Sequence, residues 1–315
     1  MTISYSNQFP RLEGLIAAPF TPMDRNGEIE YAKIAEYGGF LIRNDIRGVF
    51  INGSTGEYAS LTQKERMKVT EAWVAALKGT SLKIINLVGG TSMAECAENA
   101  LHSKACGTDA IAIVAPHYFK PAGAKQLAEF CARIAHQVPD MPVFFYHIPV
   151  LSGVTIPMIE FLKEASPLIP NLEGLKYTHE DFMDFLSCTH FGGGKYQILG
   201  GYDEILLSAL ALGCRCAVGS TFNYAAPLYY GIMNAFNRGD LTEARTLQQK
   251  AIDMIRLLGK YGGMGTGKAF MKYVGFDFGD FRLPVKAFDR SVYSQFVADI
   301  EALEMKEWFS VYDKS

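Results

Sequence analysis

The sequence has no large excess of one charge and no long basic run. Its 30 Lys and Arg residues nearly balance 33 Asp and Glu residues, which gives a formal net charge of -3 at pH 7. This balance argues against nucleic acid or an anionic membrane as the main partner. We therefore expect a small-molecule substrate, no nucleic acid and no membrane.

Long apolar runs and paired metal-ligand motifs are also missing. No run of about 18 apolar residues occurs, and residues 1–10 are polar, so we expect neither a membrane span nor a signal peptide and predict a cytoplasmic protein. The six cysteines form no Cys-x-x-Cys pair, and no histidine is at zinc-ligand spacing. We expect reduced core thiols and no metal.

What the chain does have is a regular alternation of strand-like and helix-like segments. At 315 residues and 49% hydrophobic composition it can bury a large core. Eight short apolar runs, about 30 residues apart, predict βα units that close into a (β/α)8 TIM barrel over residues 1–225. The runs are Leu12 to Phe20, Gly48 to Asn52, Lys83 to Gly89, Asp109 to Pro116, Val143 to Ile148, Leu172 to Thr178, Tyr196 to Gly201 and Arg215 to Ser220.

Helix start signals and a change of pattern complete the predicted architecture. Thr62 with Glu65 and Ser92 with Glu95 fit the capping box that begins a helix. After Phe222 the strands stop, and residues 226–315 are predicted to form a C-terminal helical region. Its expected helices are Pro227 to Asn237, Leu241 to Leu258 and Val292 to Phe309, with Asp240 capping the second and a loop through Tyr261 to Lys268 and Asp277 to Pro284.

One lysine lies inside a run that otherwise has the composition of a buried strand. Lysine is seldom buried without a reason, and the strand period of 2 sends Lys176 and Thr178 to one face and Tyr177 to the other. In apolar surroundings the amine loses its proton more easily and can attack a ketone to form a Schiff base. A lysine at a strand end that extends to water is the alternative.

Polar residues follow several of the predicted strands, where a barrel of this kind places its chemistry. Residues 53–56, Gly-Ser-Thr-Gly, offer backbone N–H groups and the hydroxyls of Ser54 and Thr55 to an anion, although an ordinary βα turn accounts for the same residues. Asp203 and Glu204 are either acceptors for sugar hydroxyls or a solvated helix start.

Strand parity also divides the residues near position 146. Tyr146 should point into the barrel with Phe144, and His147 should point out toward the helices. Tyr146 is a candidate proton shuttle or, alternatively, a core tyrosine.

Residues 262–268 match a phosphate-binding loop, but Ala269 replaces the hydroxyl residue and no strand precedes them, so we reject that reading.

Together these motifs resemble the dihydrodipicolinate synthase and N-acetylneuraminate lyase superfamily of pyruvate-dependent (β/α)8 aldolases, from about Leu12 to Pro284. Within it, residues 201–204 and 219–223 look like the N-acetylneuraminate lyase branch, and Leu151 stands where the synthase branch carries an arginine. The motifs are Gly53-Ser54-Thr55-Gly56-Glu57, Tyr146-His147-Ile148-Pro149, Gly174-Leu175-Lys176 and Gly219-Ser220-Thr221.

This resemblance implies a sialic acid lyase that needs no cofactor. Lys176 would form the Schiff base with pyruvate, Tyr146 would shuttle protons, and Ser54 and Thr55 would hold the pyruvate carboxylate. Tyr118 would reach a neighbouring subunit's site, since the family is usually a homotetramer. The residues implied to line the sugar pocket are Thr178, Gly201, Asp203, Glu204, Gly219 and Ser220. Two alternatives stay open: another pyruvate-dependent aldolase or synthase, and a non-catalytic barrel that binds an α-keto acid.

Overall fold

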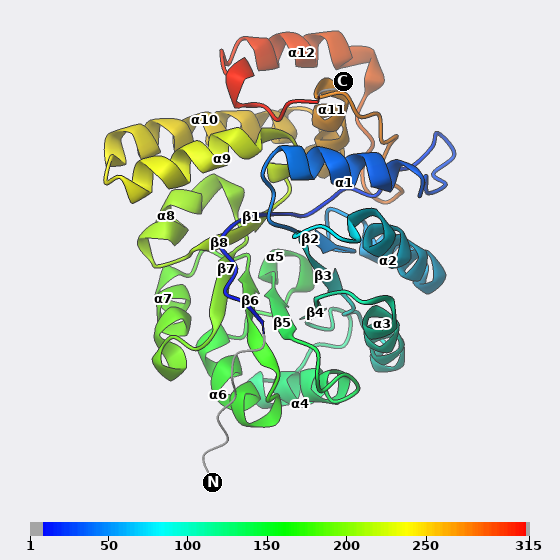
Figure 1. Ribbon diagram of the computed structural model, residues 1–315, viewed down its shortest axis with the longest axis vertical. Helices are drawn as coiled ribbons and strands as arrows, with labels where there is room; N and C mark the ends of the chain where they lie inside the picture. The colour runs from blue at the N-terminus through cyan, green and yellow to red at the C-terminus, as the bar shows by residue number, and fades with distance from the viewer. Residues whose placement is uncertain (1–8, 313–315) are drawn as a thin grey trace.

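The computed structural model describes residues 9–312 and shows a closed barrel of eight parallel strands surrounded by helices (Figure 1). Neighbours in the sequence pair around the ring, and β1 closes it by pairing with β8. The predicted TIM barrel is therefore confirmed. The strands are β1 Gly14–Ala17, β2 Gly48–Ile51, β3 Lys83–Leu87, β4 Ala110–Val114, β5 Val143–His147, β6 Leu172–Tyr177, β7 Gln197–Gly200 and β8 Cys216–Gly219.

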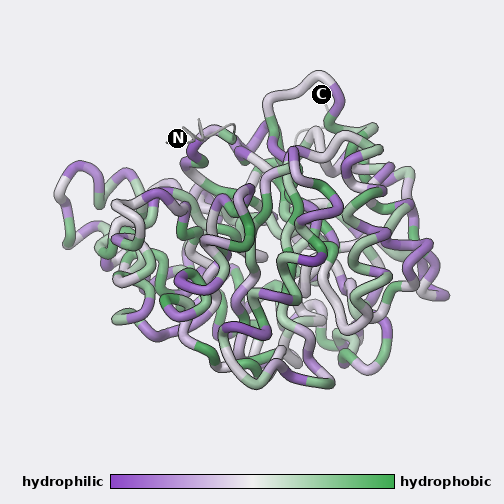
Figure 2. The backbone as a smooth tube through the Cα atoms, turned by 90° about the horizontal axis from the view of Figure 1, so that it is seen from below, coloured by the Kyte–Doolittle hydropathy of each residue, from purple (hydrophilic) through white to green (hydrophobic). Residues whose placement is uncertain are grey.

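Both faces of the sheet are buried, which explains why the strands are continuous apolar runs. Residues of alternate parity fill the barrel interior, among them Phe50, Phe144, Tyr146 and Val218, while Phe145 packs outward under the helices. Figure 2 shows hydrophobic and hydrophilic stretches alternating along the backbone, with hydrophobic ones running through the middle of the molecule. The parity predicted for β5 is confirmed.

The helices that follow the strands lie in the outer layer, except the short one that comes directly after β5 (Figure 1). They are α1 Lys33–Arg43, α2 Gln63–Leu77, α3 Met93–Cys106, α4 Ala124–Ala135, α5 Pro149–Ser152, α6 Met158–Leu168, α7 Phe182–His190, α8 Leu206–Ala211 and α9 Phe222–Asn237. Thr62 and Glu65 form the predicted capping box. At α3 only half of the box is present: Ser92 accepts from the Glu95 backbone, whereas the Glu95 carboxylate pairs with Arg66 of α2 at 3.1 Å.

The C-terminal region is helical but differs in detail from the prediction. It contains α10 Leu241–Lys260, α11 Thr266–Tyr273 and α12 Tyr293–Glu301, which lie with α9 on one side of the barrel (Figure 1). The loop predicted through Lys268 was wrong, because α11 begins at Thr266. The helix predicted to reach Phe309 was also wrong, since α12 ends at Glu301 and Glu304 adopts a positive φ of 48°.

Helix α9 begins at Phe222, earlier than the predicted Pro227. A non-helical Ala225, with φ -137°, lets the chain accommodate a proline near the start of the helix. The boundary expected between residues 225 and 226 falls inside this helix, and the division into two domains stays a prediction.

Two findings concern the membrane spans and the cysteines for which the sequence made predictions. In the part of the chain from 9 to 312, no helix combines the length and apolar character needed to cross a membrane. All six cysteines are free thiols, and five of them are buried as predicted. Cys106 is the exception, because it is only partly buried.

Candidate active site

Lys176 lies inside the barrel, pressed between two aromatic rings. It is 4% exposed, and its Nζ lies 4.1 Å from the ring centroid of Phe50 and 4.1 Å from that of Tyr146. The register explains part of this contact, since Lys176 of β6 is the partner of Tyr146 of β5. The alternative of a lysine that extends to water is therefore wrong.

The surroundings of Lys176 favour the neutral amine. Burial lowers the pKa of Lys176 to about 7, while the negative charge of Asp203 opposes this shift. A substantial share of free amine is thus present near neutral pH, and a free amine can attack a carbonyl carbon to form an imine.

Tyr146 joins the lysine to a group of hydroxyls. Its phenol hydrogen-bonds with the side chains of Ser54 and Thr178, and burial raises its pKa to about 12. The phenol is therefore protonated at neutral pH, and it can pass a proton by accepting one while it releases its own to a neighbouring hydroxyl. His147 points outward as predicted, packs against Tyr177, and is kept neutral because burial lowers its pKa to about 3.

Asp203 is buried at the end of β7 and bound to the segment after β8. Its carboxylate accepts hydrogen bonds from the Thr221 backbone N–H at 2.9 Å and the Thr221 hydroxyl at 2.6 Å. Burial raises the pKa of Asp203 to about 7, although both bonds from Thr221 oppose the shift. The solvated helix start considered for Asp203 is wrong, because this carboxylate is buried.

Two glycines in the predicted set lie too close to the site to carry a side chain. A Cβ on Gly201 would stand 2.0 Å from the Thr178 hydroxyl, and a Cβ on Gly219 would stand 2.1 Å from Oδ1 of Asp203. Both contacts are shorter than real Cβ atoms show, so only glycine at these two positions leaves room for Thr178 and Asp203.

The remaining predicted residues lie further out. Glu204, Ser220 and Thr55 are partly exposed; Glu204 follows the buried Asp203 and Ser220 follows the buried Gly219, whereas Thr55 follows Ser54, which is also partly exposed. Tyr118 is 78% exposed and contacts Phe119 with a ring centroid distance of 5.1 Å, so the structure does not bring it to the lysine within one chain.

A cavity of about 260 Å³ is lined by Ser54 but by neither Lys176 nor Tyr146, so it meets the lysine site through Ser54, which hydrogen-bonds with Tyr146. Leu151 lines it, as do residues of the C-terminal region that sequence reasoning did not connect with the site. The lining includes Val114, His117, Ile148, Met264, Phe281 and Val285. The walls near Leu151 are therefore mostly apolar.

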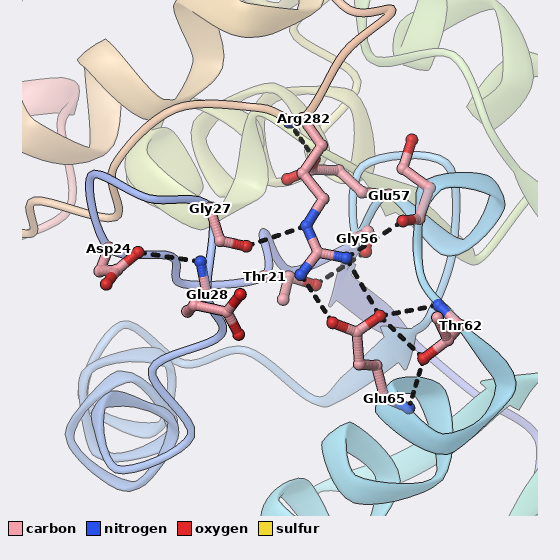
Figure 3. A network of polar contacts seen from close by, with 10 residues as sticks. Thr21, Asp24, Gly27, Glu28, Gly56, Glu57, Thr62, Glu65 and Arg282 are labelled. Carbon is pink, nitrogen blue, oxygen red and sulfur yellow. Dashed lines mark hydrogen bonds and ion pairs between the residues drawn. The ribbon is translucent and has the colours of Figure 1, made fainter.

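The turn that carries Ser54 and Thr55 is fixed from outside the barrel by a polar network (Figure 3). Glu57, with a positive φ of 63°, binds Lys268 of α11 at 2.8 Å and accepts from the Arg282 backbone N–H at 2.8 Å. The Arg282 guanidinium in turn binds both carboxylate oxygens of Glu65, at 2.6 and 3.0 Å. A 3-10 turn, Tyr58–Ser60, follows Glu57, so α2 does not begin directly after the Gly-Ser-Thr-Gly turn.

Several residues of the site were missed from the sequence. Phe50 could have been found, because the parity that placed Tyr146 also sends Phe50 inward. Glu57 and Thr221 occur in the motifs of the resemblance without a role, and neither they nor Lys268 gave a local signal of their contacts, since Glu57 binds Lys268 across 211 positions and Thr221 binds Asp203 across 18.

Comparisons with known proteins agree with this geometry. The sequence profile described as "Dihydrodipicolinate synthetase family" matches residues 11–303. The N-acetylneuraminate lyase of Xenopus tropicalis is 38% identical over 278 residues, which cover 87% of this chain and 91% of the relative. The human N-acetylneuraminate lyase is 36% identical over 313 residues, 97% of each chain. The structure of Proteus mirabilis N-acetylneuraminate lyase superposes with a TM-score of 0.90 at 37% identity, covering 93% of this chain and 99% of that one.

Proposed function

The chain belongs to the dihydrodipicolinate synthetase family, and we propose that it cleaves N-acetylneuraminate into N-acetylmannosamine and pyruvate through a Schiff base on Lys176. The observation that carries the proposal is the buried Lys176 amine between Phe50 and Tyr146, with its pKa lowered to about 7. The names of the curated relatives support the choice of substrate.

The proposed reaction begins with attack of the Lys176 amine on the ketone carbon of the open-chain sugar. Loss of water gives an iminium ion, which accepts the electron pair of the C3–C4 bond when that bond breaks. The C4 hydroxyl loses its proton to Tyr146, and C4 becomes the aldehyde of N-acetylmannosamine. Protonation of the resulting enamine at C3 and hydrolysis of the imine release pyruvate. The lysine supplies the electrophile, so the proposed chemistry calls for no cofactor.

The other residues receive roles from their positions. Ser54 and Thr55 would bind the pyruvate carboxylate, and Ser54 also contacts the Tyr146 hydroxyl through which the proton passes. Thr178, Asp203 and Glu204 would meet the sugar hydroxyls, with Gly201, Gly219 and Ser220 forming the backbone around them. The apolar Leu151 offers no cation to a second carboxylate, which disfavours an anionic semialdehyde as the substrate.

We further propose a homotetramer in the cytoplasm. The exposed ring pair of Tyr118 and Phe119, 78% and 85% exposed, supports contact with a second subunit. Six free thiols support a reducing compartment. Light scattering of the purified protein measures the mass of the assembly, and cell fractionation tests the location.

One experiment tests the proposed activity. The protein is incubated with N-acetylneuraminate, and pyruvate release is measured with a coupled assay; in parallel, pyruvate and borohydride are added and the modified peptide is identified by mass spectrometry. We expect pyruvate release and a reduced pyruvyl group on Lys176. Modification of another lysine contradicts the mechanism, and a preference for condensing pyruvate with aspartate semialdehyde contradicts the substrate.

A further inference from the structure

We propose that Glu71, His102 and Cys106 form a zinc-binding site on the outer wall of the barrel, between α2 and α3. His102 Nε2 lies 3.0 Å from Oε1 of Glu71 and 3.4 Å from Sγ of Cys106. The three ligand atoms all lie within 4.8 Å of one another. The Cys106 sulfur also lies 3.7 Å from Nδ1 of His102, so a carboxylate, an imidazole and a thiol lie within reach of one ion once the ring turns toward it.

The secondary structure explains the convergence. His102 and Cys106 are four residues apart on α3, so both project from one face of that helix. Glu71 projects from the middle of α2, which lies beside α3 (Figure 1). The sequence has no Cys-x-x-Cys pair, and the His102 and Cys106 pair gains its third neighbour only because Glu71 comes from another helix.

The separations suit a tetrahedral ion. Bonds of about 2.0 to 2.2 Å to nitrogen and oxygen and about 2.3 Å to sulfur place tetrahedral ligands about 3.4 to 3.6 Å apart. The observed 3.0 and 3.4 Å are close to these separations, and the Glu71 carboxylate lies within 4.8 Å of the Cys106 sulfur, so side-chain rotation can bring the three ligands onto one ion. A fourth position remains for water, because the Glu71 side chain is 57% exposed.

The ligand types select the ion. A thiolate and an imidazole favour zinc over magnesium or calcium, which prefer oxygen ligands. Among the ion pairs of residues 9–312, Glu71 pairs with His102 and with no lysine or arginine that would compete with a cation. His102 is largely covered, with 19% of its side chain exposed, so the ring is held near Cys106.

The proposed site is separate from the catalytic lysine. Its ligands come from the outer helices, whereas Lys176 points into the barrel. An ion bound there would link α2 to α3 and stabilise this part of the wall. We therefore expect zinc to raise the stability of the protein. Its effect on pyruvate trapping at Lys176 should be no larger in the wild type than in a variant that lacks the site.

The test uses untagged full-length protein treated with a chelator. ZnCl2 is titrated against a chromophoric chelator, and CoCl2 is used to look for the charge-transfer band of a cobalt-thiolate bond. We expect one zinc ion to bind tightly to each chain, a cobalt-thiolate band to appear with CoCl2, and the melting temperature to rise with zinc. Cys106→Ser should abolish the band, and Cys106→Ser and His102→Gln should each weaken zinc binding at least about tenfold.

Two further variants keep the result interpretable. His136→Gln changes an exposed histidine that binds the Leu168 carbonyl, and it should bind zinc like the wild type. Glu71→Gln changes an exposed side chain and should fold even if Cys106→Ser does not, yet it should also bind zinc more weakly. Absence of zinc binding in the wild type, or equal binding in Glu71→Gln, His102→Gln and His136→Gln, would overturn the proposal.

Discussion

Lys268 and Glu57 form an ion pair in which each side chain is 1% exposed and Nζ lies 2.8 Å from Oε1. The two residues are 211 positions apart, and the pair joins α11 to the turn after β2. Lys268 also donates to the Asp280 carbonyl at 3.0 Å, and Glu57 accepts from the Arg282 backbone. The C-terminal region is thus fixed to the turn that carries Ser54 and Thr55.

Lys268→Met should destabilise the protein strongly, because it leaves the Glu57 carboxylate buried without its cation. We expect the free energy of unfolding to fall by about 3 to 5 kcal/mol. The KM for pyruvate in the condensation direction should rise, since the turn next to Glu57 is released. Denaturant unfolding and steady-state kinetics measure the two effects.

Lys260→Met is the matched control, because Lys260 pairs with Asp299 while 56% of its side chain is exposed. An exposed pair contributes about 0 to 1 kcal/mol, so the control should remain near wild-type stability. Equal losses in the two variants would show that burial of the Lys268 pair has no special effect.

The barrel and the central residues of the site could be predicted because they depend on local patterns. Strand parity placed Tyr146 inside and His147 outside, and it put Lys176 on the face opposite Tyr177. The register then brings Lys176 and Tyr146 together as partners on neighbouring strands.

Contacts between distant segments could not be predicted in the same way. Neither Glu57 nor Lys268 carries a local signal for a pair formed across 211 positions. From the sequence, Asp203 could be either a site residue or an exposed acid at a helix start, because its contact with Thr221 from the segment after β8 leaves no local signal. Helix α11 was missed because the glycines before Thr266 suggested a loop.

Imine formation should depend on pH through Lys176. Because its pKa is about 7, the rate of pyruvate trapping with cyanoborohydride should rise as the pH passes through about 7, where the ammonium loses its proton. The charge of Asp203 stabilises the ammonium, so Asp203→Asn should lower the pKa of Lys176 further and move the midpoint to lower pH. Glu204→Gln is the control and should leave the midpoint nearly unchanged. A midpoint that stays fixed or rises in Asp203→Asn contradicts this electrostatic coupling.

Tyr146→Phe should lower kcat by about 10² to 10⁴, the usual effect of removing a positioned proton-transfer group, while pyruvate trapping survives at least in part. Loss of the buried hydroxyl should also cost about 1 kcal/mol of stability. Tyr177→Phe is the matched control, because it removes a tyrosine hydroxyl that binds Asp184 at 2.9 Å on the outer face of the barrel. If both variants keep nearly full kcat, Tyr146 is only a core tyrosine.

Asp203 and Glu204 are adjacent, yet the structure gives them different surroundings and therefore different expected losses. Glu204 is partly exposed, so Glu204→Ala should remove an acceptor for a sugar hydroxyl and lower kcat/KM for N-acetylneuraminate by about 1 to 3 kcal/mol. Pyruvate trapping and stability should stay close to wild type, because neither depends on that hydroxyl.

Asp203→Ala should lower cleavage by at least as much and should also lower stability, since the Thr221 N–H and hydroxyl lose their carboxylate partner. All three quantities, kcat/KM, trapping with borohydride and the melting temperature, are measured on the same preparations. Asp203→Asn separates the two effects, because it retains an oxygen acceptor for Thr221 while it removes the charge. If Glu204→Ala loses trapping as much as cleavage, Glu204 supports the start of the turn after β7 and does not bind the sugar.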